Sequence, residues 1–481
     1  MASLDMNGDG RPIGPDPGDL GEAFLARRRK LILWTAITSN ILGNSGLIGL
    51  NVALPVIQRE MGLGAVQVSW LALSTLLAMA MASAPVARLS DLVGRHRITV
   101  IGLWVTIITS LLGALSTSYA TLVISRAFCG LGLVSFFTTI TTMVTAEYPP
   151  RERGRVLGLT ISSVYVGLSV GPLLVGFLVQ YLGWRSLFWY TVFGMIPPLV
   201  LIKMVSPDSP PTPDERLDWV GAILWILGLG LGFTGLASLG RGFAVPALAG
   251  GLVLVVLFFL RSLGSGNPIL DMRLFFDSRR FSFSSLAAYI SYLSSFSITF
   301  LMSLYLQYTK GLSPSHAGIY LMAQPVVQAA LTPLSGKLSD RMEPSRLASG
   351  GLFAILAAIL VFALMLGEAT PDAILIATMA LTGAGFAFFS APNSNSMMSS
   401  VPPMRLGQAS GVITVTRLCG QISSMALTTL VFGLVIGEGA ITPDKYPAFL
   451  SASRICFWIF APICLTGILA SLACRTRPKL D

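Results

Sequence analysis

Apolar stretches of about 20 residues recur along almost the whole chain, and short polar segments separate them. A helix of about that length crosses the ~30 Å hydrocarbon core of a membrane, so the pattern predicts about fourteen transmembrane helices in an all-α membrane protein. The predicted spans are residues 31–57, 66–88, 98–115, 119–146, 155–180, 185–204, 219–239, 243–261, 282–308, 315–335, 347–366, 372–396, 408–435 and 452–474.

Composition supports a membrane protein. Hydrophobic residues make up 53% of the chain and charged residues 11%, whereas soluble proteins carry about 25% charged residues. The first 26 residues are polar and lack the apolar core of a signal peptide, which predicts a disordered cytoplasmic tail. Asp5, Asn7 and Asp9 match part of a calcium-loop spacing, but Pro12 and Pro15 interrupt it, so no metal site is expected.

The distribution of charge fixes the expected orientation. If the N-terminus is cytoplasmic, most Lys and Arg residues fall at cytoplasmic helix ends, and Arg126 and Arg417 stand alone within spans. Both termini are therefore expected in the cytoplasm, with the protein in the plasma or inner membrane. The net charge of +10 then reflects contact with anionic lipid rather than with nucleic acid.

The chain contains an internal repeat. The segment PPRERGRVLGLTISSVYVG aligns with PPMRLGQASGVITVTRLCG, and ARLSDLVGRHR resembles GKLSDRMEPSR at a nearly equal offset. The first alignment superposes Pro149 on Pro402, Gly154 on Gly407, Gly158 on Gly411 and Gly167 on Gly420. Duplication predicts two parallel helical bundles with a site between them. The expected division is a tail at 1–26, a six-helix bundle at 27–204, two linker helices at 205–281, a second six-helix bundle at 282–474 and a cytoplasmic tail at 475–481.

Two groups of residues are candidates for a conformational switch. In the first loop, Asp91, Gly94 and Arg95 form a short charged turn that can pair across helix ends, and Asp340 and Arg341 occupy the second copy. The alternative is that these charges only set the orientation in the membrane. In the second group, Gly167, Gly171 and Pro172 permit close helix packing and a bend, although ordinary packing alone also explains them.

Together these motifs resemble the major facilitator superfamily, and in particular its fourteen-span drug:proton antiporter branch. The resemblance rests on the loop motif around Asp91, on SRAFCGLG around Arg126, on GLSVGPLLVG at 167–176, and on NVALPVI and LYLQYTKGLSPSHAG. It implies a multidrug efflux transporter that works by alternating access. The chain departs from the branch at Gly46, where the first-span pattern of that branch carries Asp.

Polar residues within the spans are the candidate substrate-binding residues. At 100° per residue, Asn40, Asn44 and Asn51 fall within an arc of about 40° on one helix. Arg417 and Gln421 share a face of another span, as do Gln324 and Gln328. The proposed binding residues are Asn40, Asn44, Arg126, Gln324, Gln328, Asn393, Arg417 and Gln421. The alternative for the amides is hydrogen bonding between helices without a solute.

The acids give the strongest constraint on mechanism. None of the 22 Asp and Glu residues lies near the middle of a predicted span. Proton exchange needs an intramembrane group that titrates, and arginine does not deprotonate at ordinary pH. A cavity with arginine and amides but no carboxylate is expected to favour anionic or neutral solutes over cations.

Two functions therefore remain open. The first, from the resemblance, is an efflux-type secondary transporter of small organic solutes or drugs. The second is an anionic or neutral metabolite transporter, or a facilitator, that is not coupled to protons. A receptor or scaffold without transport is disfavoured because no long soluble segment is present. No catalytic residue, phosphate-binding loop or cofactor site is expected, so the chain is predicted to be a transporter rather than an enzyme. It is also predicted to be a monomer.

Overall fold

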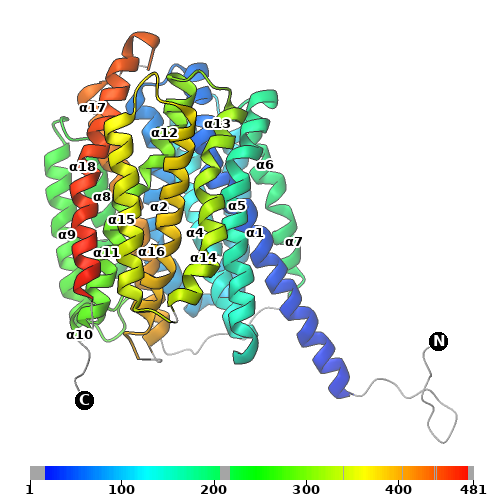
Figure 1. Cartoon of the computed structure of the whole chain (residues 1–481). Helices are drawn as coiled ribbons and strands as arrows, with labels where there is room; N and C mark the ends of the chain where they lie inside the picture. Colours follow the sequence, from blue (N-terminus) through cyan, green and yellow to red (C-terminus); the bar gives the residue numbers. More distant parts are fainter. Residues whose placement is uncertain are drawn as a thin grey trace, which may run out of the picture.

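The computed structural model describes residues 17–205, 217–339, 341–402, 405–437, 439 and 441–474. Every regular element within these ranges is a helix, which confirms the predicted all-α membrane fold. Figure 1 shows the helices as one upright bundle, with the start of α1 and the end of α18 at its lower end. The segment with partial calcium-loop spacing, Asp340 and the tail at 475–481 lie outside the described residues.

The helices follow the chain in three groups. The first group is α1 (Pro17–Met61), α2 (Ala65–Val93), α3 (Arg95–Ala114), α4 (Tyr119–Glu147), α5 (Pro150–Leu182), α6 (Arg185–Gly194) and α7 (Ile196–Lys203). The linker group is α8 (Trp219–Ala237), α9 (Ala244–Gly264) and the short α10 (Leu274–Asp277). The second group is α11 (Arg279–Ser295), α12 (Ser297–Tyr308), α13 (Pro314–Leu321), α14 (Ala323–Ser339), α15 (Pro344–Met365), α16 (Asp372–Met398), α17 (Leu406–Val435) and α18 (Tyr446–Ala473), with a 3-10 turn at Pro443–Lys445.

Thirteen helical stretches of the described chain are long and apolar enough to cross a membrane. The remaining predicted span, 315–335, is divided at Met322 into α13 and α14, which are 8 and 17 residues long. Pro325 accounts for the division, because proline has no N–H to donate to the carbonyl of Leu321. The predicted crossing at 315–335 is therefore built from two consecutive helices.

The start of α1 differs from the prediction. The helix begins at Pro17, whereas the sequence predicts a tail up to residue 26. Proline is favoured at the first helical position, where its missing N–H has no partner to lose. Further along, Arg28 pairs with Glu147 at the end of α4 at 3.1 Å, which holds α1 against the bundle.

The two main groups meet along a small number of helix pairs. α1 packs on α12, α2 on α17, and α5 on both α13 and α14. The linker helix α8 packs on α2 and on α17, and the indole N–H of Trp225 donates to the carbonyl of Ala80 at 3.1 Å. The linker therefore covers the line along which α2 meets α17.

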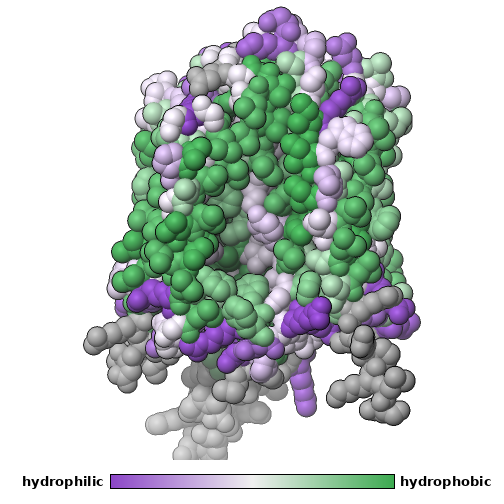
Figure 2. Space-filling view, turned by 90° about the vertical axis from the view of Figure 1, so that its left-hand side faces the viewer, coloured by the Kyte–Doolittle hydropathy of each residue, from purple (hydrophilic) through white to green (hydrophobic). Residues whose placement is uncertain are grey.

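The surface has the pattern of a protein embedded in lipid. Figure 2 shows a face whose middle is mostly covered by hydrophobic residues, with hydrophilic residues gathered at its lower and upper edges. Exposed large side chains such as Trp34, Ile101, Phe193 and Leu252 contribute to the apolar surface. Contact with lipid accounts for the exposure of these apolar residues in a membrane-spanning bundle.

Candidate functional site

A cavity of about 700 Å³ lies between the two main helix groups. Its wall is formed by α1, α2, α4 and α5 on one side and by α11, α12, α14, α16 and α17 on the other. Asp91 at the end of α2 and Gly407 at the start of α17 also line it, so the cavity extends to the lower end of the bundle. This volume suits a small organic molecule.

At the upper end, direct hydrogen bonds join the two groups. The hydroxyl of Ser303 on α12 donates to the carbonyl of Asn51 on α1 at 2.7 Å. The backbone N–H of Ser315 on α13 donates to Gln180 Oε1 on α5 at 3.3 Å, and the Ser315 hydroxyl contacts the same oxygen. The described state is therefore closed at its upper end and hollow below.

The three asparagines of α1 lie together on the cavity wall. Asn40, Asn44 and Asn51 all line the cavity, as expected from their 100° spacing. The Asn40 side chain donates to the carbonyl of Thr160 on α5 at 3.4 Å, and the Asn44 side chain donates to the carbonyl of Asn40 at 2.8 Å. These bonds orient the amides while leaving part of their hydrogen-bonding capacity available.

Arg126 of α4 lines the same cavity and is nearly buried, with 5% of its surface exposed. Its Nη1 lies 4.0 Å from Cys129 Sγ. Its Nε and Nη2 are buried and have no hydrogen-bond partner among the described residues. A guanidinium with two unpaired nitrogens in an apolar bundle is a costly feature to retain.

The second group contributes charged, amide and aromatic side chains. Arg417 and Gln421 of α17 and Gln324 and Gln328 of α14 line the cavity, and Arg417 is exposed within the structure. Gln324 Oε1 accepts a hydrogen bond from Thr299 Oγ1 at 3.2 Å. The aromatic side chains in the wall are Phe137, Tyr165, Tyr292, Phe296 and Phe386, none of which is among the binding residues predicted from the sequence.

Asn393 has a different place from the one predicted. It is buried, is absent from the cavity wall, and donates from its side chain to the carbonyl of Ser284 on α11 at 3.1 Å. Its neighbour Asn395 donates to Ser339 Oγ on α14 at 3.2 Å. Both amides therefore join helices of the second group, which is the alternative role considered for polar residues in spans.

Two carboxylates line the cavity, contrary to the expectation of a wall without acids. One is Asp91, and the other is Asp271, which follows α9 and is 7% exposed. Asp271 Oδ1 accepts the backbone N–H of Arg273 at 3.1 Å, and the carbonyl of Leu270 accepts the hydroxyl of Ser262 on α9. This loop folds back against the cavity. Helical periodicity in the sequence could not predict this position, because the residues lie outside the helices.

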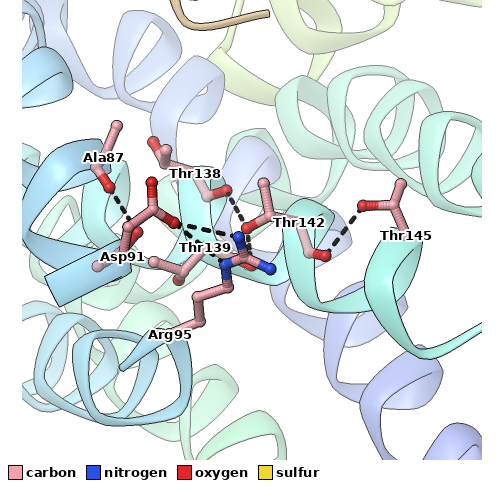
Figure 3. Close-up of polar contacts among 8 residues, drawn as sticks. Ala87, Asp91, Arg95, Thr138, Thr139, Thr142 and Thr145 are labelled. Atoms are coloured by element: carbon pink, nitrogen blue, oxygen red, sulfur yellow. Dashed lines mark hydrogen bonds and ion pairs between the residues drawn. The ribbon is translucent and has the colours of Figure 1, made fainter. Parts of the chain in front are cut away.

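The switch residues of the first loop form a local ion pair. Arg95 Nη2 lies 3.1 Å from Asp91 Oδ1, and Figure 3 shows the pair beside the threonine side chains near the end of α4. Gly94 between them has φ +107, a conformation that favours glycine, and it ends α2 and begins α3. Both partners belong to the first group, so this pair does not join the two groups. Arg341 of the second copy follows α14 and is exposed.

The glycine and proline residues of the predicted α5 motif contact two different helices. A Cβ at Gly167 or Gly171 would overlap backbone atoms of α1, so these residues hold α5 against its neighbour in the first group. Pro172 lies instead against Gly318 of α13, in the second group. The predicted motif therefore contacts both groups from a single helix.

Comparisons with known proteins all point to one family of transporters. The model described as "Major Facilitator Superfamily" matches residues 33–267 and 284–481. The "Uncharacterized transporter YebQ" of Escherichia coli (strain K12) is 30% identical over 438 residues, covering 90% of this chain and 95% of that protein. The "Riboflavin transporter RibZ" of Clostridioides difficile (strain 630) is 25% identical and covers 88% and 92%. "Multidrug resistance protein Stp" of Mycobacterium tuberculosis (strain CDC 1551 / Oshkosh) is 28% identical and covers 78% and 71%.

Solved structures share the fold at low sequence identity. A bacterial homolog of the human lysosomal transporter Spinster, in an inward-facing and occupied conformation, matches with a TM-score of 0.64 and 18% identity. That match covers 97% of this chain and all of the other chain. The peptide transporter POT in complex with sulfate matches with a TM-score of 0.66 and 16% identity, covering 90% and 93%.

Proposed function

The chain belongs to the Major Facilitator Superfamily and is a secondary membrane transporter rather than an enzyme, and from this premise we propose that its solutes are neutral or anionic. The solute binds in the cavity between the helix groups, and the protein alternates between states open at opposite ends. We further propose that one chain is the working unit, that it resides in the plasma or inner membrane, and that both termini are cytoplasmic.

The observation that carries this proposal is the distribution of charge along the cavity. Arg126 lies inside α4 and Arg417 inside α17, whereas Asp91 and Asp271 stand at a helix end and in a loop. Positive potential inside a low-dielectric cavity attracts anions and opposes cations. The amides of Asn44 and Gln328 add donors and acceptors that suit neutral polar groups.

A second candidate is export of drugs in exchange for protons. The relatives named Stp and JefA, both from Mycobacterium tuberculosis, are described as a multidrug resistance protein and a drug efflux pump. Asp271 supplies a cavity carboxylate that a proton and a cationic solute could share. Asp91 is less suited because Arg95 already pairs with it.

Reconstitution in liposomes separates the two candidates. Uptake of three labelled probes is measured with and without an imposed pH gradient: phthalate as an aromatic dianion, riboflavin as a neutral solute and tetraphenylphosphonium as a lipophilic cation. We expect protein-dependent movement of phthalate or riboflavin and none of the cation. Gradient-driven movement of tetraphenylphosphonium, with neither other probe transported, would refute the proposal in favour of drug–proton exchange.

A further inference from the structure

The guanidinium of Arg126 has one buried edge without a hydrogen-bond partner among the described residues. Its Nε and Nη2 are the two nitrogens without a hydrogen-bond partner, and they lie on the same side of the planar group. The remaining nitrogen, Nη1, is the one that contacts Cys129 Sγ at 4.0 Å. The unpaired atoms are therefore not scattered over the side chain but form a fork of two parallel N–H groups.

Such a fork matches the two oxygens of a carboxylate. Nε–H and Nη2–H point in nearly the same direction, with a spacing that allows two parallel N–H···O bonds to one planar anion. A lysine ammonium could supply the charge but not this pair of directed donors. The free edge therefore indicates a planar oxyanion rather than a general preference for negative charge.

No described side chain supplies that anion. The cavity carboxylates are Asp91, bonded to Arg95, and Asp271, held in its loop by the N–H of Arg273. Arg126 lies near the start of α4, whereas Thr142 borders the Asp91 pair sixteen residues further along, or about 24 Å as helix. Among the described residues, the Arg126 edge therefore has no carboxylate partner.

The surroundings narrow the class of ligand. Tyr292 and Phe386 line the cavity with their ring centroids 5.6 Å apart, and Phe137 lines it from α4. Aromatic faces in a wall of this kind pack against planar apolar groups. Because these rings and Arg126 line the same cavity, they favour a ligand that carries both an aromatic ring and a carboxylate.

We propose that the Nε–Nη2 edge of Arg126 is the binding site for the carboxylate of an aromatic acid carried through the cavity. The proposal rests on the proposed function and makes it specific. In the described state both nitrogens are screened from solvent, and only the small exposed part of the side chain reaches the cavity. Binding through this edge requires the guanidinium to turn toward the cavity, where the carboxylate would supply two charged hydrogen bonds to the unpaired nitrogens.

The first test needs no ligand. Met fills most of the volume of Arg126 without a buried charge, so purified Arg126→Met in detergent is expected to melt at the wild-type temperature or above it. A residue with a purely structural role behaves in the opposite way, because its removal lowers the melting temperature. A clear loss of stability in this variant would overturn the assignment.

The second test uses phthalate as the probe and phthalamide, its uncharged analogue of the same shape, as the control ligand. Phthalate is expected to raise the melting temperature of the wild type and phthalamide to leave it unchanged. Arg126→Lys, which keeps the charge but loses the fork, is expected to bind phthalate at least about tenfold more weakly. The control variant is Arg185→Met, because Arg185 pairs with Glu60 outside the cavity wall, and it should retain the phthalate effect.

The outcomes separate this inference from the proposed function. A phthalate effect that persists in both Arg126 variants overturns the Arg126 site, while anion binding in the cavity and hence the proposed function stand. Stabilisation by tetraphenylphosphonium, with none by phthalate or riboflavin, overturns both. Loss of the phthalate effect in Arg126→Lys, with normal stability and an intact effect in Arg185→Met, supports the site.

Discussion

At the scale of single residues, Pro55 explains how α1 can bond to the opposite helix group. In a regular helix the N–H of residue 55 would donate to the carbonyl of Asn51, but proline has no N–H. That carbonyl instead accepts the hydroxyl of Ser303 at 2.7 Å, and Ser303 is fully buried. The carbonyl of the next residue in α1, Val52, accepts a hydrogen bond from Gln307 Nε2 at 3.0 Å. The missing N–H of Pro55 thus leaves the Asn51 carbonyl free to accept the hydrogen bond that closes the upper end.

This arrangement predicts a coupled effect of two substitutions. Ser303→Ala removes the donor, and Pro55→Ala restores a helical N–H that competes for the Asn51 carbonyl. Each variant is expected to destabilise the state that is closed at its upper end by about 1 kcal/mol. This corresponds to a roughly fivefold increase in the ratio of open to closed molecules. Distances between spin labels at the upper ends of α1 and α12 report this ratio.

The double variant decides whether the two residues act on the same bond. If they do, Pro55→Ala adds little to Ser303→Ala, whereas independent effects would add. Ser297→Ala serves as the control, because Ser297 bonds Ser424 at 2.8 Å within the second group. Additive effects, or an equal opening in the control variant, would contradict the explanation.

At the scale of helices, α5 packs closely against helices of both groups. A Cβ at Gly171 would lie 2.6 Å from Ser45 Cα and 2.8 Å from the Ser45 carbonyl oxygen, so α1 and α5 would have to separate. Gly158 lies on the same helix and is exposed, and a Cβ added there would meet no atom within 4 Å. The two glycines therefore provide a matched pair with different packing.

We expect Gly171→Ala to destabilise the protein by about 1–3 kcal/mol through overpacking. Gly158→Ala should be neutral or gain up to about 1 kcal/mol, because alanine is the better helix former. Thermal unfolding in detergent measures both. Equal melting temperatures for the two variants would mean that α1 and α5 separate without cost and that the close contact contributes nothing to stability.

The helices also show how far sequence reasoning reaches. Hydropathy locates the crossings, and the 100° rule brings Asn40, Asn44 and Asn51 to one wall, because both depend only on local chain geometry. Asn393 escapes this reasoning, since periodicity gives the face of a helix but not the neighbour that the face meets. Asp271 escapes it because its position depends on how a loop folds back.

At the scale of the whole molecule, the contacts between the groups are arranged unequally. The upper end is held by hydrogen bonds that α12 donates to α1 and α13 donates to α5, while the lower end surrounds the cavity. Alternating access requires the upper contacts to separate as the lower helices approach one another. The linker helix α8 lies on both α2 and α17, so it must slide on one of them during this motion.

Cross-linking the upper end tests this motion directly. Gln180 on α5 and Ser315 on α13 are in hydrogen-bond contact, so a short thiol cross-linker should join cysteines placed at both positions in the described state. Because the bond holds the two groups together, we expect transport in liposomes to fall at least about tenfold and to return when a cleavable cross-linker is reduced. The matched control joins Ser349 and Ser471, whose hydroxyls are 2.9 Å apart on α15 and α18 of the second group. That link joins two helices that move together, so it should leave transport intact. Full transport by the protein cross-linked between Gln180 and Ser315 would show that the transport cycle does not open the upper end at α5.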